Sequence, residues 1–385
     1  MNTQKIKQKN IRMALIGASF ISASTVMISF FLPYFLKEKG LGILEIGFLF
    51  TIGLAVGSLL FGVIFSKILD KIRLRTGLIS TSLLSSISTL IVYISPSLGG
   101  ALLSKIGNRV ESVIAYISND VTMQHNVTEK TRKKVSALHL ISDTFGLTIG
   151  LILGVLLIKT YNFSVAFLVF AILAIPALFF FSKVDDKTRF RRKEKNKLKK
   201  IPLKLKLILI SELAYWLGLA SSFALVVTFL VTDKFQGSIE WIAILFIGLY
   251  ISITVTTLVM NKLAKRLNLI KTSIFGMFIL LLSAIVIILS TNLYFVFIAF
   301  LLEGIGAGIW VPSKTAIYWQ LAPKNQRESI SGYLFGTRSF LNNLGPLVGG
   351  WLAVTFGILG PFYLKAGIAI FSILIYISIL KTKTK

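Results

Sequence analysis

Hydrophobic residues lie along this chain in long runs, and charged residues collect in the short segments between them. Twelve runs are long enough to cross the roughly 30 Å of hydrocarbon in a bilayer. Because backbone polar groups in lipid must be satisfied within the segment, each run predicts a transmembrane α-helix. The first run is too long for a cleavable signal peptide, and further spans follow it directly. The predicted helices are residues 13–35, 43–66, 77–95, 97–118, 137–158, 162–182, 207–231, 238–260, 270–290, 293–313, 331–354 and 358–380.

The chain also resembles itself when it is shifted by 195 residues, with no gap. The matches include glycines and charged residues, which hydrophobicity alone would not align. The matched pairs are Lys39 with Lys234, Gly42 with Gly237, Glu45 with Glu240, Ile52 with Ile247, Gly53 with Gly248, Leu54 with Leu249, Arg132 with Arg327, Ser136 with Ser331, Gly150 with Gly345, Gly154 with Gly349 and Phe167 with Phe362. Two parallel halves are typical of transporters that rock one half against the other. We therefore predict an all-α integral membrane protein with twelve transmembrane helices in two parallel six-helix bundles.

Composition agrees with a membrane protein and excludes several kinds of chemistry. Hydrophobic residues make up 55% of the 385 positions and charged residues 15%, which is too apolar for a soluble protein. The chain has no cysteine, so disulfides and thiolate chemistry are excluded, and His125 and His139 alone cannot form a histidine metal cluster. The net charge of +27 lies between apolar runs rather than on one soluble face. We expect no metal, no cofactor and no nucleic-acid partner, and a lipid bilayer as the surroundings.

The distribution of Lys and Arg predicts the orientation in the membrane, because cytoplasmic loops carry the excess of positive charge. Basic residues cluster at the N-terminus, after the second and fourth spans, in the central connection and in the C-terminal tail. We expect a cell-membrane protein with both termini cytoplasmic, an N-terminal bundle over 1–184, a basic linker over 185–206 and a C-terminal bundle over 207–385. The linker also suits contact with anionic lipid headgroups. The basic residues assigned to the opposite side are Lys37, Lys39, Lys159, Lys234 and Lys365.

Twelve helices in two parallel halves with a basic linker resemble the major facilitator superfamily over nearly the whole chain. After its second helix that family carries Gly-x-x-x-Asp-Arg-x-Gly-Arg-Arg, and residues 66–75 here read SKILDKIRLR. Asp70 and Arg75 match, Lys71 matches in charge, and both glycines are replaced. The resemblance implies that Asp70, Lys71 and Arg75 form a cytoplasmic gate. A carboxylate at a helix end can pair with a neighbouring helix N-terminus or a loop arginine.

Glycines at every fourth position mark the predicted fifth helix, at Gly146, Gly150 and Gly154. This spacing resembles the Gly-x-x-x-Gly-Pro-x-x-Gly-Gly pattern of drug antiporters, with Leu151 in place of the proline. A fuller version, GPLVGG, occupies residues 345–350 of the eleventh helix. Among members of the family, the chain most resembles bacterial drug/proton antiporters, although its motifs diverge from theirs. Small residues at this spacing also let helices approach closely, so packing alone explains them.

Ionisable residues inside apolar runs are costly unless they face a cavity or a partner, so they mark candidate functional positions. Polar side chains form stripes on the first, fourth, seventh and tenth predicted helices, which line the central cavity in the family. Trp310 equally suits an interfacial anchor, and Glu212 lies close enough to its span's end to reach the headgroups. The candidate substrate- and proton-binding residues are Ser22, Thr25, Arg109, Ser112, Tyr116, Glu212, Tyr215, Trp216, Glu303 and Trp310.

Three carboxylates raise more specific hypotheses. Glu303, in the middle of its span, is the predicted proton-coupling residue, and Glu212 is the next candidate. Arg109 stands at nearly the equivalent depth in the other half, so the two charges either attract each other across the cavity or each has a partner in its own half. His139 and Asp143, four positions apart, suit a proton relay or a local hydrogen bond.

The resemblance implies a secondary active transporter that works by alternating access. We predict proton-coupled export of an amphipathic small molecule by a monomeric protein. A proton-coupled importer of sugars or other nutrients and a lipid flippase are the alternatives within this fold, and Lys105 with Arg109 on one helix would suit a flippase. We do not expect an enzyme, because the chain has no cysteine and no Ser-His-acid arrangement at membrane depth.

Overall fold

The computed structural model describes residues 3–61, 73–126, 129–184, 202–263, 267–322 and 327–381, and nearly all of these are helical. They divide into two compact units. Unit 1 comprises Met1–Leu41 and Ile52–Lys193, and unit 2 comprises Gly42–Thr51 and Glu194–Lys385. Residues 185–201 of the predicted linker lie outside the described residues, residues 203–206 are helical, and the predicted bundle boundaries stay a prediction.

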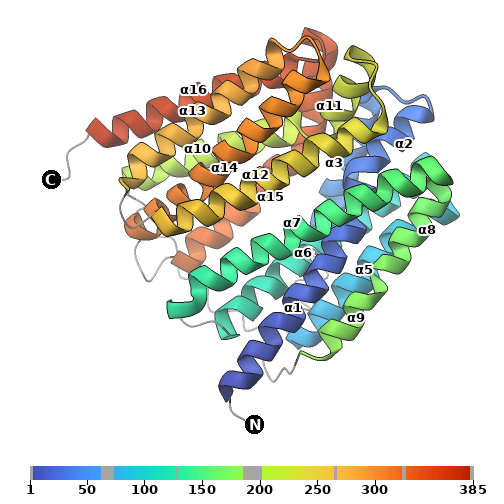
Figure 1. Ribbon diagram of the computed structural model, residues 1–385, viewed down its shortest axis with the longest axis horizontal. Helices are drawn as coiled ribbons and strands as arrows, with labels where there is room; N and C mark the ends of the chain where they lie inside the picture. Colours follow the sequence, from blue (N-terminus) through green and yellow to red (C-terminus); the bar gives the residue numbers. More distant parts are fainter. Residues whose placement is uncertain are drawn as a thin grey trace. The chain divides into compact units, whose positions relative to one another are not determined.

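Unit 1 holds the helices of the first half of the chain (Figure 1, blue to green). The first span is α1 continued by a π-helical turn, η1, and by α2. α3 is divided at Thr51 and contributes to both units. The bounds are α1 Thr3–Val26, η1 Met27–Phe31, α2 Leu32–Glu38, α3 Ile43–Leu60, α5 Leu74–Ile94, α6 Leu98–Asn126, α7 Glu129–Thr160, α8 Phe163–Leu173 and α9 Ile175–Ser182.

Unit 2 repeats this order in the second half of the chain (Figure 1, yellow-green to red). Its first span is again interrupted, here by a short helix and a π-helical turn. The bounds are α10 Leu203–Ser222, α11 Ala224–Phe229, η3 Leu230–Lys234, α12 Ile239–Leu263, α13 Leu269–Ile288, α14 Leu293–Leu321, α15 Arg327–Phe356 and α16 Gly360–Lys381.

The helix boundaries follow the 195-residue repeat seen in the sequence. Adding 195 to the bounds of α5, 74–94, gives 269–289, and α13 occupies Leu269–Ile288. Adding 195 to the bounds of α6, 98–126, gives 293–321, the bounds of α14. Within each unit the first and fifth spans pack together, α7 against α1 and α15 against α10. The halves therefore share both their helix boundaries and this packing.

Ten helices in the described part of the chain are long and apolar enough to cross a membrane, against the twelve predicted. The two predicted spans that do not qualify are α6 and α15, both of which form long helices. α6 carries Lys105, Arg109 and Glu111 within seven positions, and α15 carries two asparagines, three glycines and a proline in its second half. Their polar content lowers their hydropathy, so the count of twelve is not confirmed.

Local sequence explains where several helices begin and where one breaks. The side chains of Asn162, Asn268 and Asn292 accept backbone N–H bonds at the starts of α8, α13 and α14, as N-cap residues do. The predicted span 162–182 is divided into α8 and α9 at Ala174. Pro176 causes this break, because proline has no N–H to donate to the preceding turn.

Glycines account for the close packing of α7 on α1. A Cβ atom at Gly150 would lie 2.6 Å from the carbonyl oxygen of Ala23, and one at Gly146 would overlap that of Ser19. In unit 2, Gly345 and Gly349 of α15 meet Ala220 and Ser221 of α10 in the same way. The glycine spacing that resembles a drug-antiporter pattern is therefore required by helix packing in both halves.

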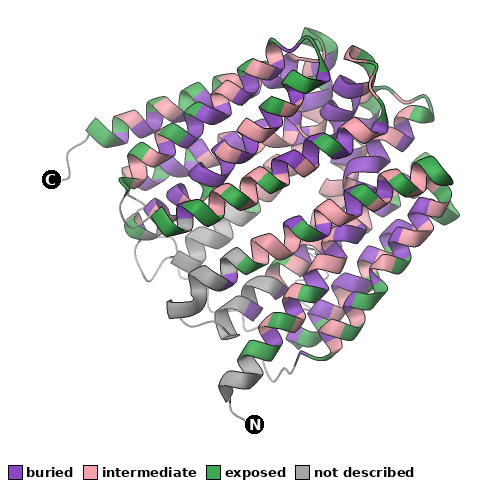
Figure 2. Cartoon of the chain, in the orientation of Figure 1, coloured by how far each residue is buried: buried purple, intermediate pink, exposed green. Residues whose placement is uncertain are grey.

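Buried and exposed positions alternate along the helices of each unit (Figure 2). The core of unit 1 includes Leu78, Ile114 and Phe181, and that of unit 2 includes Trp310 and Tyr376. Large apolar side chains also lie on exposed faces, including Phe48, Leu156, Phe275 and Leu374. A bilayer would cover such faces, which are too apolar for water.

Candidate functional site

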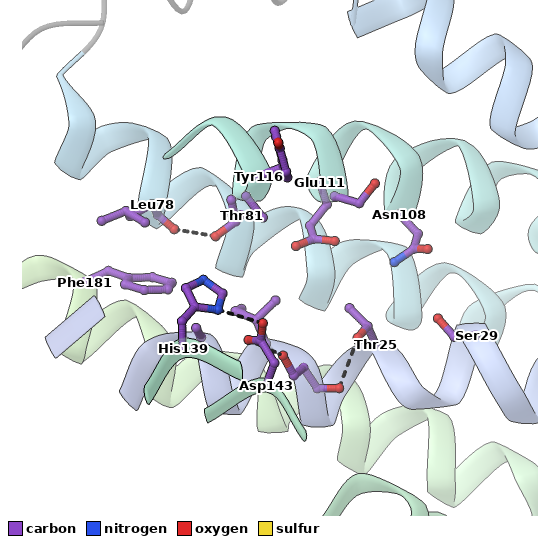
Figure 3. Close-up of a pocket in the computed structure, with 15 residues that line it drawn as sticks. Thr25, Ser29, Leu78, Thr81, Asn108, Glu111, Tyr116, His139, Asp143 and Phe181 are labelled. Atoms are coloured by element: carbon purple, nitrogen blue, oxygen red, sulfur yellow. Dashed lines mark hydrogen bonds and ion pairs between the residues drawn. The ribbon is translucent and has the colours of Figure 1, made fainter. Parts of the chain in front are cut away.

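Unit 1 contains a cavity of about 480 Å³, within the size range of small-molecule sites. Side chains from six elements line it, and Figure 3 shows them converging on one space. The lining residues are Ala18, Ile21, Ser22 and Thr25 of α1, Ser29 of η1, Leu78 and Thr81 of α5, Asn108, Glu111, Ser112, Ala115 and Tyr116 of α6, His139 and Asp143 of α7, and Phe181 of α9.

Helical periodicity explains why these residues share one face. Asn108, Glu111, Ser112, Ala115 and Tyr116 are spaced three and four apart, so they form one stripe of α6. Ser22, Thr25 and Ser29 repeat the spacing on α1 and η1. Four residues predicted to bind substrate or protons, Ser22, Thr25, Ser112 and Tyr116, are therefore brought together in one cavity.

His139 and Asp143 form an ion pair within α7, with 2.8 Å between Nδ1 and Oδ2. The hydroxyl of Ser22 on α1 donates to the other carboxylate oxygen of Asp143, at 3.2 Å. Both partners are drawn in Figure 3, where the His139 ring lies beside Asp143. The local hydrogen bond expected for this pair is present, and the pair also lines the cavity. Asp143 is thus already compensated by neighbours on two helices.

The two cations of α6 are bound elsewhere. Arg109 Nε donates to Ser58 Oγ of α3 at 2.8 Å, and Lys105 Nζ donates to the carbonyl oxygen of Ile28 at 2.9 Å. Neither residue is among those that line the unit 1 cavity. Arg109, a predicted cavity residue, is bound to Ser58 of α3 and does not line this cavity. Glu111, two positions further, faces the cavity instead (Figure 3).

Unit 2 contains a buried ion pair at Glu303, in the middle of α14. Lys365 Nζ lies 2.7 Å from Glu303 Oε2, and Ser283 of α13 donates to the same oxygen at 3.0 Å. The other carboxylate oxygen, Oε1, has no hydrogen-bond partner among the described residues. Both charged side chains are less than 10% exposed. A small cavity of about 10 Å³ adjoins Glu303 and Lys365, large enough for about one water molecule.

A second charged cluster in unit 2 surrounds Trp216. Glu212 of α10 forms an ion pair with Lys314 of α14, and Trp216 Nε1 donates to Glu212 at 3.4 Å. The guanidinium of Arg338 lies 3.2 Å from the centre of the Trp216 ring, a cation–π geometry. Glu212 is thus held inside the unit by Lys314.

The aromatic candidates of unit 2 pack around Trp310. Its ring lies 4.4 Å from that of Tyr215, centre to centre, and its Nε1 donates to the Tyr376 hydroxyl at 3.2 Å. Trp310 is fully buried and its ring lies beneath the ammonium of Lys314. It is a core residue of unit 2, not the interfacial anchor considered from the sequence.

The predicted cytoplasmic gate is described only in part. Asp70 and Lys71 lie outside the described residues. Arg75 is described and exposed, in the first turn of α5. The gate stays a prediction.

Lys365 and Glu111 are two site residues that are not among the predicted ones. Lys365 was assigned to the loops of the non-cytoplasmic side, but it lies on α16, is 7% exposed and pairs with Glu303. Its position seven residues inside the predicted span 358–380 was the signal that could have found it. Glu111 is not among the predicted site residues. Its spacing from Asn108 and Ser112 could have placed it on the cavity stripe.

A polytopic helical membrane protein with buried charges and a polar cavity inside one half is typical of a transporter. The family model described as Major Facilitator Superfamily matches residues 14–232 and 208–385. The chain belongs to this superfamily. Its relatives support a secondary transporter, and their fold and family indicate a protein that is not an enzyme. No curated protein matches the chain in sequence.

Solved structures share the fold over the whole chain. The human organic anion transporter MFSD10 (TETRAN) superposes with a TM-score of 0.71 at 14% identity, covering 96% of this chain and 99% of that one. A bacterial homologue of the iron transporter ferroportin, inward-facing, gives 0.74 at 15% identity, with 98% and 99% covered. A bacterial homologue of the human lysosomal transporter Spinster gives 0.71 at 12% identity, with 100% and 98% covered. At these identities the likeness shows the fold alone.

Proposed function

We propose that this protein is a proton-coupled exporter of an amphipathic small molecule that works by alternating access. The unit 1 cavity receives the substrate, and the Glu303–Lys365 pair of unit 2 couples transport to protons. Membership of the superfamily supports the transporter class. The cavity supports an amphipathic substrate, because its lining combines carboxylates and hydroxyls with the apolar side chains of Ile21, Leu78 and Phe181.

The observation that carries the proton coupling is the geometry of Glu303. One carboxylate oxygen holds Lys365 and Ser283, and the other is buried without a partner among the described residues. A proton on Glu303 removes the negative charge that holds Lys365, and the lysine then sits in a buried site without its counter-charge. Such a loss is strongly unfavourable in the conformation that buries the pair. Protonation therefore favours a different arrangement of unit 2, which is what coupling requires.

Two further features support this assignment over Glu212. Glu212 is bound by both Lys314 and Trp216. Glu303 adjoins the 10 Å³ cavity, which offers room for about one water molecule beside the carboxylate and the ammonium. A water there could carry a proton to or from Oε1. Glu303 is thus the better placed of the two carboxylates to gain and lose a proton during a cycle.

Transport in proteoliposomes with an imposed pH gradient tests the proposal, using a panel of dyes, sugars and amino acids. We expect the gradient to drive accumulation of an amphipathic member, and Glu303→Gln to abolish this while leaving substrate exchange without a gradient largely intact. Glu45→Gln is the matched control, since Glu45 is exposed at the start of α3. Gradient-driven flux at the wild-type rate in Glu303→Gln would show that Glu303 is not the coupling residue. Accumulation of sugars alone would favour the importer.

A further inference from the structure

Glu111 is a carboxylate that the structure buries without compensation. The residue is 2% exposed, and its side chain lines the unit 1 cavity. Within the described part of the chain, no group donates a hydrogen bond to it or forms an ion pair with it. Figure 3 shows its carboxylate directed across the cavity toward the side chains of α1 and α7. Asp143, by contrast, already has His139 and Ser22.

A buried carboxylate with no partner is costly in a membrane protein. The cations on its own helix do not relieve the cost, because Lys105 is bound to Ile28 and Arg109 to Ser58. Among the described residues that line the cavity there is no lysine or arginine, and the one histidine, His139, is paired with Asp143. This cost is relieved when the carboxylate takes up a proton or when a ligand brings a positive charge into the cavity. The cavity therefore favours a cationic ligand, and it disfavours an anionic one.

The hydroxyl groups of the cavity also point to a ligand with N–H donors. Four of the six hydroxyl groups that line the cavity already donate to other acceptors: Ser22 donates to Asp143, Thr25 to the carbonyl of Ser22, Thr81 to that of Leu78 and Ser112 to that of Arg109. These oxygens therefore offer lone pairs to the cavity. A cavity rich in acceptors complements a protonated amine, which carries up to three N–H donors and no acceptor.

We propose that the unit 1 cavity binds an amphipathic primary amine in its protonated form, with Glu111 as its counter-charge. The ammonium group lies against Glu111 and the hydroxyl oxygens of α1 and α6. The apolar body of the ligand lies against Ile21, Leu78 and Phe181, which also line the cavity. This inference rests on the proposed function and names the substrate class of that transporter.

Binding to the purified transporter in lipid nanodiscs tests the proposal with three probes of similar shape. Tryptamine carries the cation, tryptophol is neutral and indole-propionate is an anion. We expect tryptamine to bind most tightly. Glu111→Gln should weaken it about 10- to 100-fold, the range for a hydrogen bond to a charged group, and should leave tryptophol binding nearly unchanged. Glu111→Asp keeps the charge and should lose less. Glu38→Gln is the control, because Glu38 is exposed at the end of α2.

Thermal melting of each variant shows whether it folds. If Glu111→Gln does not fold, the affinity of Glu111→Asp, which is expected to be intermediate, still tests the proposal. Equal binding of tryptamine by wild type and Glu111→Gln would overturn the proposal. So would tighter binding of indole-propionate, or absence of amine binding at millimolar concentration, which would leave Glu111 as a proton site. Glu111-dependent tryptamine binding without any gradient-driven flux would keep the ligand assignment and overturn the proposed function.

Discussion

For the buried pair Glu303–Lys365 we predict that substitutions have different effects on stability and on transport. Lys365→Met removes the positive charge and leaves Glu303, whose side chain is 6% exposed, without its ion-pair partner. Breaking a buried pair by removing one partner costs about 3–5 kcal/mol, whereas replacing both charges by uncharged groups is often neutral. We therefore expect Lys365→Met and Glu303→Gln each to destabilise the protein. The double variant should lie close to the wild type.

The arithmetic follows from a double-mutant cycle. If the single variants lose about 3 kcal/mol each and the double variant loses about 1 kcal/mol or less, the two losses are far from additive. Equilibrium unfolding in mixed SDS micelles measures the three free energies, with Glu45→Gln as an exposed control. In proteoliposomes, the double variant should fold like the wild type and still lack transport driven by a pH gradient.

Two results would refute this reasoning. Additive losses in the double variant would mean that the 2.7 Å contact contributes little to stability. If a stable double variant still accumulates substrate when a pH gradient is imposed, the pair has a structural role and another residue couples transport to protons.

Three further predictions concern helix packing, independent partners and the gate. Gly150→Ala should lower the melting temperature, because its Cβ would lie 2.6 Å from the Ala23 carbonyl oxygen. The control Gly336→Ala, with nothing within 4 Å of its Cβ, should be neutral or stabilising by up to about 1 kcal/mol. Equal melting temperatures of the two variants would show that α7 does not need a glycine at position 150. Arg109 and Glu303 each have a partner in their own unit, so Arg109→Gln and Glu303→Gln should combine additively within about 0.5 kcal/mol of substrate-binding free energy; a larger coupling energy would restore the hypothesis that they attract each other. Asp70→Asn should increase labelling of a cysteine introduced on the cytoplasmic side of the cavity, a clean readout in a chain without native cysteine; unchanged labelling would argue against the gate.

The sequence predicts the fold in most of its detail because lipid and the repeat both constrain it. The run predicted at 77–95 became α5 at Leu74–Ile94, and the shift of 195 residues maps α6 onto α14 to the residue. Hydropathy predicts the helix ends less well where a helix is polar. The span predicted at 97–118 extends to Asn126 in α6. Periodicity could not show the break at Ala174, which depends on one proline.

The candidate site was predicted in part, and the reason lies in side-chain direction. Spacing placed Ser22, Thr25, Ser112 and Tyr116 on common faces, and they do line one cavity. Residue spacing did not predict the hydrogen bond between Arg109 and Ser58 of α3. A long side chain can reach several neighbours, and the sequence does not show which of them lie close by. The Glu303–Lys365 pair joins residues 62 positions apart on different helices. Only the packing of both α14 and α16 against α13 brings them together.

The most direct test of proton-coupled transport is the movement of protons itself. Proteoliposomes that contain a trapped pH-sensitive dye and no initial pH gradient are given an outwardly or inwardly directed gradient of the transported amphipathic substrate. Coupling requires that the substrate gradient drive protons in the opposite direction in wild type, and that Glu303→Gln abolish this flux while Glu45→Gln retains it. Substrate movement with no change in internal pH in the wild-type protein would contradict the account.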